Sequence, residues 1–345
     1  MRTFAKIACT LILGTAVYSH SMDEEGWASI YESIAAFENR TDASAAICPG
    51  CFNRPGYVKP IINNLGNILN SNWYVSASVP QSMSIEAGLP LAIIPIGDDD
   101  KTFSENGMSV PTIFGDHGDP LVQTGLIYGN ETLNGLGVFL YPYAQVGFGM
   151  YHARAVMRFM YLPAISELQR FSLFGFGLQY SFGQFFQHKL PAAAKPLDVS
   201  LVFGYSMSGI GYQPEDYEGQ LDLDVSAFTI DMVVGYKPIK MFEIMMTLGY
   251  QYANMESSGT LTCATVDAAG QPQGFFGQEL HPNISVKGNN GFKFGLEVAF
   301  QIGASFHPVA GFDYAGKSSF TTNVLYFKQQ FGEDENQTKN EEGKK

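Results

Sequence analysis

Alternation with a period of two, sustained over whole strand lengths, is the feature that most constrains the fold of this chain. In residues 151–161 (YHARAVMRFMY) the odd positions are all apolar or aromatic, with Tyr151 and Tyr161 at the two ends. The even positions place His152, Arg154 and Arg158 on the opposite face. Successive side chains of a strand point to opposite faces, so this stretch predicts a β-strand between an apolar and a polar environment.

The same alternation recurs through most of the chain after residue 73. It is clear in several stretches: Phe174–Phe182, Leu197–Met207, Phe228–Tyr236, Phe242–Tyr252 and Phe292–Ile302. It is weaker in others: Trp73–Val79, Ser82–Ile93, Ser109–Phe114, Leu121–Tyr128, Leu136–Phe148, Ile284–Lys287, Phe306–Tyr314 and Phe320–Phe331. Short connections such as Lys237–Lys240 are expected at one end of the strands, and long polar loops at the other: Gly97–Gly107, Gly209–Gln220 and Asn254–Asn290. This layout is typical of an outer-membrane barrel.

We therefore expect an all-β fold: a closed antiparallel transmembrane β-barrel of about 14 strands (roughly 12–16). Strands of about 11 residues, tilted by about 40°, span roughly 28 Å, close to the apolar band of such barrels. Charged residues make up only 15% of the chain, against about 25% in soluble domains. A secreted β-sandwich or lectin-like protein is the alternative, because its strands also alternate.

The beginning of the chain has a different character. Residues 1–21 are expected to be a cleaved signal peptide, with Arg2 and Lys6 before a short apolar core and Ser19-His20-Ser21 before the cut; an uncleaved anchor is the alternative. Residues 22–72 contain helical spacing at Glu24–Asn39 and Tyr57–Leu69, which predicts a helical plug or periplasmic segment. Residues 73–331 would form the barrel, and residues 332–345 a disordered charged tail.

Three stretches carry a family resemblance: Asn72–Ile96, Val110–Gly115 and Arg158–Pro163. They resemble a family of uncharacterised bacterial outer-membrane barrel proteins, a domain of unknown function, over about residues 55–330. The layout is also similar to that of the long-chain fatty-acid transporter family, which has an N-terminal plug and a 14-strand barrel. The resemblance implies a fold and a location, and no reaction.

Few residue patterns suggest chemistry. Cys48 and Cys51 (CPGC) are candidates for a local disulfide in an oxidising periplasm, with a redox pair or a metal half-site as alternatives, and Cys263 is then left over. Asp98-Asp99-Asp100 and Gly115–Pro120 carry possible cation ligands but read first as an acidic loop and a turn. We find no nucleophile elbow and no phosphate-binding loop. We therefore expect no catalytic residue, no metal site and no cofactor, and the chain is not expected to be an enzyme.

Charged residues on the polar faces are the candidates for function, because a charge facing lipid would cost about 2–4 kcal/mol at the midplane. The lumen-facing candidates are His152, Arg154, Arg158, Asp198, Asp231, Glu243, Lys293 and Glu297. These groups could set a field across the lumen for a polar solute, or they could form ion pairs that hold the N-terminal segment as a plug.

The expected function is passive transport of small, possibly hydrophobic, solutes across the outer membrane of a Gram-negative bacterium, gated by the plug. A structural or surface-interaction barrel without transport is the alternative. The expected partners are outer-membrane lipid, lipopolysaccharide, the barrel assembly machinery and a small solute. Nucleic acid is not expected, because the formal net charge is −13.

Overall fold

The computed structural model describes residues 54–105, 108–112, 114–115, 137–164, 168–213, 217–239, 241–263, 284–303 and 305–331. Several expectations lie outside these residues and stay predictions. They are the signal peptide, the helix at Glu24–Asn39, the Cys48–Cys51 disulfide, the strand at Leu121–Tyr128 and the tail at 332–345. No helix in the described part of the chain is long and apolar enough to cross a membrane.

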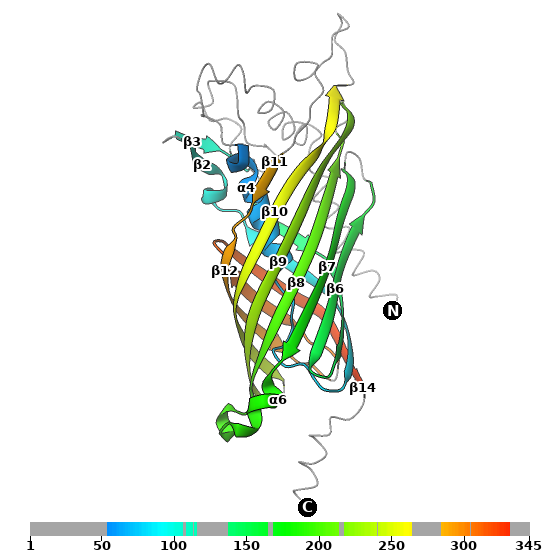
Figure 1. Ribbon diagram of the computed structural model, residues 1–345, viewed down its shortest axis with the longest axis vertical. Helices are drawn as coiled ribbons and strands as arrows, with labels where there is room; N and C mark the ends of the chain where they lie inside the picture. The colour runs from blue at the N-terminus through cyan, green and yellow to red at the C-terminus, as the bar shows by residue number, and fades with distance from the viewer. Residues whose placement is uncertain are drawn as a thin grey trace, which may run out of the picture.

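Antiparallel pairing closes the chain into a barrel (Figure 1). Its strands are β1 (Met83–Pro95), β4 (Val138–Pro142), β5 (Ala144–Met150), β6 (Ala153–Leu162), β7 (Leu168–Ser181), β8 (Leu197–Tyr212), β9 (Tyr217–Ile239), β10 (Phe242–Cys263), β12 (Gly291–Phe300), β13 (Val309–Tyr314) and β14 (Ser318–Phe331). Each of them pairs with its neighbour around the ring, and β14 pairs with β1 to close it. β4 and β5 share one position, because both pair with β1 on the same side and only Tyr143 separates them.

The ring therefore has 10 positions, fewer than the 14 or so expected. The difference comes from four of the expected strands: three are not wall strands, and the fourth, Leu121–Tyr128, lies outside the described residues. Trp73–Val79 runs inside the ring; β3 (Met108–Pro111) pairs only with β2 (Thr102–Glu105) in a separate hairpin; and β11 (Ile284–Lys287) pairs only with the far part of β10. Extended backbone alternates wherever its two sides differ, whether or not it belongs to the wall.

The outside of the ring carries a band of exposed apolar side chains. On β10 this face runs from Phe242 through Leu248 to Tyr252, and Leu248 is 46% exposed. At about 3.3 Å per residue and a tilt of about 40°, the stretch Phe242–Tyr252 spans about 25 Å. Tyr252 stacks on Phe228 of β9, with ring centroids 5.5 Å apart, where the band ends. The apolar surface thus has the height of a lipid-facing belt.

The wall is much taller on one side than on the other. β9 and β10 have 23 and 22 residues, whereas β13 has 6. Beyond Tyr252 the outward face of β10 changes to polar residues such as Glu256 and Ser258, both exposed. For this reason the loops expected at Gly209–Gln220 and Asn254–Asn290 were wrong in part: β8, β9 and β10 continue into them without an apolar face to reveal them. Residues 264–283 of the second loop lie outside the described ranges.

The connections differ between the two ends of the barrel. At the short-turn end lie the turn at Tyr151-His152 and three short helical pieces between β7 and β8. These are α6 (Gly183–Phe186), η3 (Gln187–Lys189) and η4 (Ala192–Ala194). The opposite end, the long-loop end, carries η1 (Asp98–Asp100) and the β2–β3 hairpin.

The ring encloses the segment that precedes β1, residues 54–81, which we call the plug. Helix α4 (Arg54–Asn70) lies inside the long-loop half and contacts β1, β8, β9, β10 and β11 (Figure 1). The helix expected at Tyr57–Leu69 is thereby confirmed. Residues Ser71–Gln81, which we call the inner segment, continue through the other half toward β1. The wall thus begins at Met83, and not at Trp73, where the sequence placed it.

Candidate functional site

Helix α4 fills its half of the lumen as an apolar core. Val58, Ile62, Leu65, Ile68 and Leu69 are at most 3% exposed. They pack against Val286 of β11 and among inward-facing side chains of the wall, which include Ala92, Ile94, Tyr141, Leu173, Val225, Ala227, Ala253 and Met255. Fully burying an aliphatic side chain contributes about 1.5–3 kcal/mol, so the set stabilises the enclosed helix by about 10 kcal/mol.

Trp73, near the start of the inner segment, is tightly enclosed. Trp73 is 1% exposed and donates from its indole nitrogen to the carbonyl oxygen of Leu69 at 3.2 Å. Its ring lies over glycines of β7 and β8, and a Cβ added at Gly204 would lie 2.3 Å from the indole. On the other side, the guanidinium of Arg158 stacks over the ring, 3.6 Å from its centroid. Only glycine leaves room for the indole against this wall.

Arg158 is held by the plug rather than by an acid. Its guanidinium donates to the carbonyl oxygen of Ser71 at 2.7 Å and to the side chain of Gln145 at 2.9 Å. A second aromatic ring, that of Tyr143, lies 4.9 Å from the guanidinium carbon. Among the described residues Arg158 forms no ion pair. Its charge is stabilised by carbonyl dipoles and aromatic faces.

Arg154 connects the wall to the inner segment. Its guanidinium pairs with Glu86 of β1 at 2.5 Å and donates to the carbonyl oxygen of Trp73 at 2.8 Å. Tyr326 of β14 donates to the same carboxylate, and Lys328 lies 3.4 Å from its other oxygen. The carboxylate of Glu86 on β1 therefore connects β6 and β14, and Arg154 links this group to the inner segment.

Two of the predicted lumen charges meet directly. Lys293 of β12 pairs with Asp231 of β9 at 2.6 Å, and both side chains are at most 2% exposed. The same ammonium donates to the carbonyl oxygen of Asn70 at 2.9 Å, at the end of α4. Thr229 donates to Asp231 at 2.8 Å. Lys293 and Asp231 lie on the two strands that flank β10, and together they hold the end of α4 through Asn70.

Farther along, side chains of the wall bind the backbone of the inner segment. Glu243 of β10 accepts from the hydroxyl of Ser76 at 2.8 Å and from the amide of Ala77 at 2.9 Å. Opposite it, Gln179 of β7 donates to the carbonyl oxygen of Ser76 at 2.7 Å. These polar contacts add to an apolar cluster, in which Trp73, Tyr74, Val75 and Ala77 of the inner segment pack among side chains of the wall.

The other predicted candidates have different surroundings. His152 is half-buried in the β5–β6 turn, with its Nδ1 3.1 Å from the carbonyl oxygen of Val79. Asp198 is buried at the short-turn end and accepts from the amide of Gly183 and the hydroxyl of Ser181. Glu297 is buried on β12. The structure therefore brings Asp231 and Lys293 together but does not gather all eight candidates into one group.

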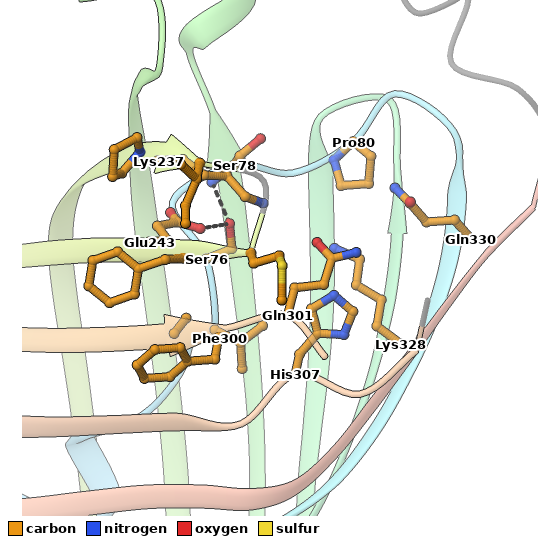
Figure 2. Close-up of a pocket in the computed structure, with 16 residues that line it drawn as sticks. Ser76, Ser78, Pro80, Lys237, Glu243, Phe300, Gln301, His307, Lys328 and Gln330 are labelled. Carbon is orange, nitrogen blue, oxygen red and sulfur yellow. Dashed lines mark hydrogen bonds between the residues drawn. The ribbon is translucent and has the colours of Figure 1, made fainter. Parts of the chain in front are cut away.

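A hollow opens beside the inner segment at the short-turn end, with a volume of about 650 Å³. Figure 2 shows Ser76, Ser78 and Lys237 on one side of it, and His307, Lys328 and Gln301 on the other. Glu243 and Gln330 also line it, together with apolar residues: Val75, Pro80, Pro238, Ile239, Met241, Phe242, Ala299 and Phe300. The volume lies within the range of small-molecule sites.

The acidic loop at Asp98–Asp100 is tied down within the structure. Asp100 is 8% exposed, forms an ion pair with Lys317, and accepts from the amide of Gly97 at 2.9 Å. Within the described ranges, no group of three or more His, Cys, Asp or Glu side chains is placed to hold a metal ion. Most of Gly115–Pro120 lies outside those ranges.

A family model, described as a family of unknown function (DUF6588), matches residues 54–318. This chain belongs to that family. The match spans α4, the inner segment and most of the ring, so the enclosed plug is part of the family's matched region. It confirms the family resemblance seen in the sequence. No curated protein matches the DUF6588 chain.

Several solved outer-membrane proteins are similar in structure at low identity. Ail of Yersinia pestis, in complex with the heparin analogue sucrose octasulfate, is 9% identical, with a TM-score of 0.29 over 72% of this chain and 99% of Ail. The P. putida toluene transporter TodX is 10% identical, with a TM-score of 0.31 over 75% and 71%. The translocator domain of the autotransporter NalP from Neisseria meningitidis is 10% identical, with a TM-score of 0.33 over 87% and 99%. At these scores the similarities carry no argument about what the DUF6588 chain binds.

Proposed function

We propose that this protein is an outer-membrane barrel for passive transport of small solutes, closed at rest by its plug and opened by movement of the inner segment. The observation that carries the proposal is the polar attachment of the inner segment at Ser76 and Ala77. α4 is surrounded by apolar side chains, and Trp73–Val75 are buried in a second apolar cluster. Ser76 and Ala77, in contrast, bind the polar side chains of Glu243 and Gln179. A solute-sized hollow adjoins the inner segment.

The two parts differ in how readily they can move. Extracting α4 would expose five large apolar side chains, at about 10 kcal/mol in total. A hydrogen bond broken in the presence of water costs only about 0.5–1.5 kcal/mol net. Trp73, Tyr74 and Val75 anchor the start of the inner segment, whereas residues 76–81 bury only the apolar side chains of Ala77 and Val79. Residues 76–81 can therefore shift while α4 stays in place. This refines the expectation from the sequence that plug movement gates the lumen.

The proposal requires that the apolar band face lipid. Leu248→Arg places a charge within the band on β10, and it should destabilise the folded barrel by about 2–4 kcal/mol. Ser258→Arg lies on the same face of the same strand beyond the band, where the effect should be about 0–1 kcal/mol. Folding titrations in lipid vesicles, followed by heat-modifiable gel mobility, measure both. Equal effects of the two substitutions would contradict a lipid-facing band.

Solute flux tests the transport step. Glu243→Ala removes the acceptor for Ser76 and Ala77, so the inner segment should leave its closed position more often. We expect slow swelling of proteoliposomes in small neutral sugars for the wild type, and a several-fold faster rate for Glu243→Ala. Glu256→Ala, an exposed carboxylate on the outward face of the same strand, is the matched control. If neither the wild type nor Glu243→Ala admits any solute, transport is not the function.

One observation favours the second candidate function, surface interaction. β9 and β10 extend well beyond the apolar band as a hairpin, where Asp222 and Asp224 pair with Arg170 of β7 and keep 30% and 63% of their side-chain surface exposed. Carboxylates in this position could bind lipopolysaccharide through divalent ions. Loss of adhesion to lipopolysaccharide without any change in flux, after this hairpin is shortened, distinguishes the two functions.

A further inference from the structure

The lining of the hollow at the short-turn end combines apolar and charged side chains, and this combination is informative about its ligand. Val75, Pro80 and Ala299 are among the apolar residues, and Lys237, Lys328 and Glu243 are the charged ones. A site with apolar surface and a few convergent polar groups is the usual form of a small-molecule pocket. The protein as a whole is acidic, with a formal net charge of −13, so two lysines at one hollow are a local departure from its average.

The basic side chains around the hollow come from three separate parts of the wall. Lys237 lies at the end of β9, His307 in the connection between β12 and β13, and Lys328 near the end of β14. In the described part of the chain, the ammonium of Lys237 forms no ion pair. Lys328 has a carboxylate partner in Glu86, at 3.4 Å. At least one ammonium is thus available to a ligand.

Two carboxylates lie near these groups, and both already accept hydrogen bonds from other partners. Glu243 is buried and already accepts from the hydroxyl of Ser76 and the amide of Ala77, and Glu86 is shared among Arg154, Tyr326 and Lys328. Figure 2 shows Glu243 turned toward Ser76, while Lys328 and Gln301 lie next to His307. The Nδ1 of His307 is buried, and no hydrogen-bond partner lies among the described residues.

We propose that this hollow binds an anionic group joined to an apolar body, such as an aromatic carboxylate. The anion lies between Lys237 and the His307–Lys328 side, where Gln301 and Ser78 can donate hydrogen bonds to it. The apolar body lies against Val75, Pro80 and Ala299. The proposal deepens the proposed function, because it assigns a class of solute to the hollow beside the movable inner segment.

The imidazole of His307 gives the site an expected pH dependence. Burial, together with the ammonium groups of Lys328 and Lys237, lowers the pKa of His307, while Glu86 and the backbone of Ser305 act in the opposite direction. A bound anion offsets the two ammonium charges, so anion binding and protonation of His307 favour each other. Affinity for the anion should therefore rise as the pH falls through the lowered pKa of His307.

Calorimetric titration of the detergent-solubilised full-length protein with benzoate, benzamide and inorganic phosphate tests the site. Benzoate should bind more tightly than both benzamide, which lacks the charge, and phosphate, which lacks the apolar body. Lys237→Gln should weaken benzoate binding about tenfold, the effect of losing one charge-assisted hydrogen bond. Lys189→Gln, an exposed lysine at the same end of the barrel, should leave it unchanged. His307→Gln should abolish the gain in affinity between about pH 8 and about pH 5.5.

Three results would overturn the proposal: no binding of benzoate, equal binding of benzoate and benzamide, or benzoate binding that Lys237→Gln leaves intact. The headgroup of an anionic lipid offers the same chemistry as a free solute. Weaker benzoate binding in nanodiscs that contain anionic lipid would assign the site to a headgroup, and equal binding to a free solute. These measurements report binding at equilibrium and do not depend on transport. Benzoate binding without solute flux would contradict the transport function alone. Solute flux without benzoate binding would contradict only this binding site.

Discussion

Gly204→Leu is expected to displace Trp73 from the wall and to convert a closed barrel into a conducting one. A Cβ at Gly204 would lie 2.3 Å from the indole, so the ring cannot stay where it is. Overpacking of this kind costs about 1–3 kcal/mol, and the larger leucine side chain places this change at the upper end. The inner segment offers the easier movement, because the wall at β8 is fixed by ladders to β7 and β9.

Two measurements follow the displacement. The chain has two tryptophans, so in a Trp27→Phe background the emission reports Trp73 alone. Gly204→Leu should shift this emission to longer wavelength as the indole becomes hydrated, and it should produce stepwise conductance in planar bilayers. Gly137→Leu is the control, since nothing lies within 4 Å of a Cβ there. A red shift without conductance would show that moving Trp73 does not open the lumen, and the proposed gate would be wrong.

Lys293→Met is expected to have the largest effect on stability, lowering the free energy of unfolding by about 3–5 kcal/mol, because it leaves the carboxylate of Asp231 buried without its counter-ion. The double variant Lys293→Met/Asp231→Leu should recover much of that loss, since both charges are then gone. The carbonyl oxygen of Asn70 also loses its donor, so the recovery should be incomplete. Denaturant titrations of the detergent-solubilised protein measure both variants against the wild type.

An exposed ion pair provides the comparison. Arg170, whose side chain is 43% exposed, pairs with Asp222 and Asp224 in water. Arg170→Met should change the free energy of unfolding by at most about 1 kcal/mol. Equal effects of Lys293→Met and Arg170→Met would show that the Asp231–Lys293 pair is not buried in the folded protein.

The sequence predicted wall strands well where lipid-like and lumen-like surroundings differ across the backbone. Phe242–Tyr252 alternates clearly because each outward residue lies in the apolar band. The same strand continues to Cys263 without such contrast, since both its outward face and the solvent around it are polar. Trp73–Val79 shows the opposite case: its side chains alternate, but this extended segment does not pair with any strand in the described part of the chain.

The contacts of the lumen charges depended on information that alternation does not contain. The alternation of side chains along the strand predicted that Arg154 faces the lumen. The same alternation in the weak strand Ser82–Ile93 would have predicted that Glu86 faces the lumen as well. Their ion pair arises because β6 and β1 both flank β5, which is a property of the closed ring. The role of Trp73 as the partner of Arg158 had no sequence signal, because a tryptophan in an alternating stretch reads first as a wall residue.

The enclosed helix constrains the order in which the barrel can form. The seam between β1 and β14 joins the first and last wall strands, so it is the pairing with the greatest sequence separation and the slowest to be found. α4 precedes β1 and lies inside the finished ring, so it must be in place no later than closure of this seam. Its apolar face then offers the growing sheet a surface to curve around. The segment that blocks the lumen of the mature protein would thus also act as the internal template on which the wall is assembled.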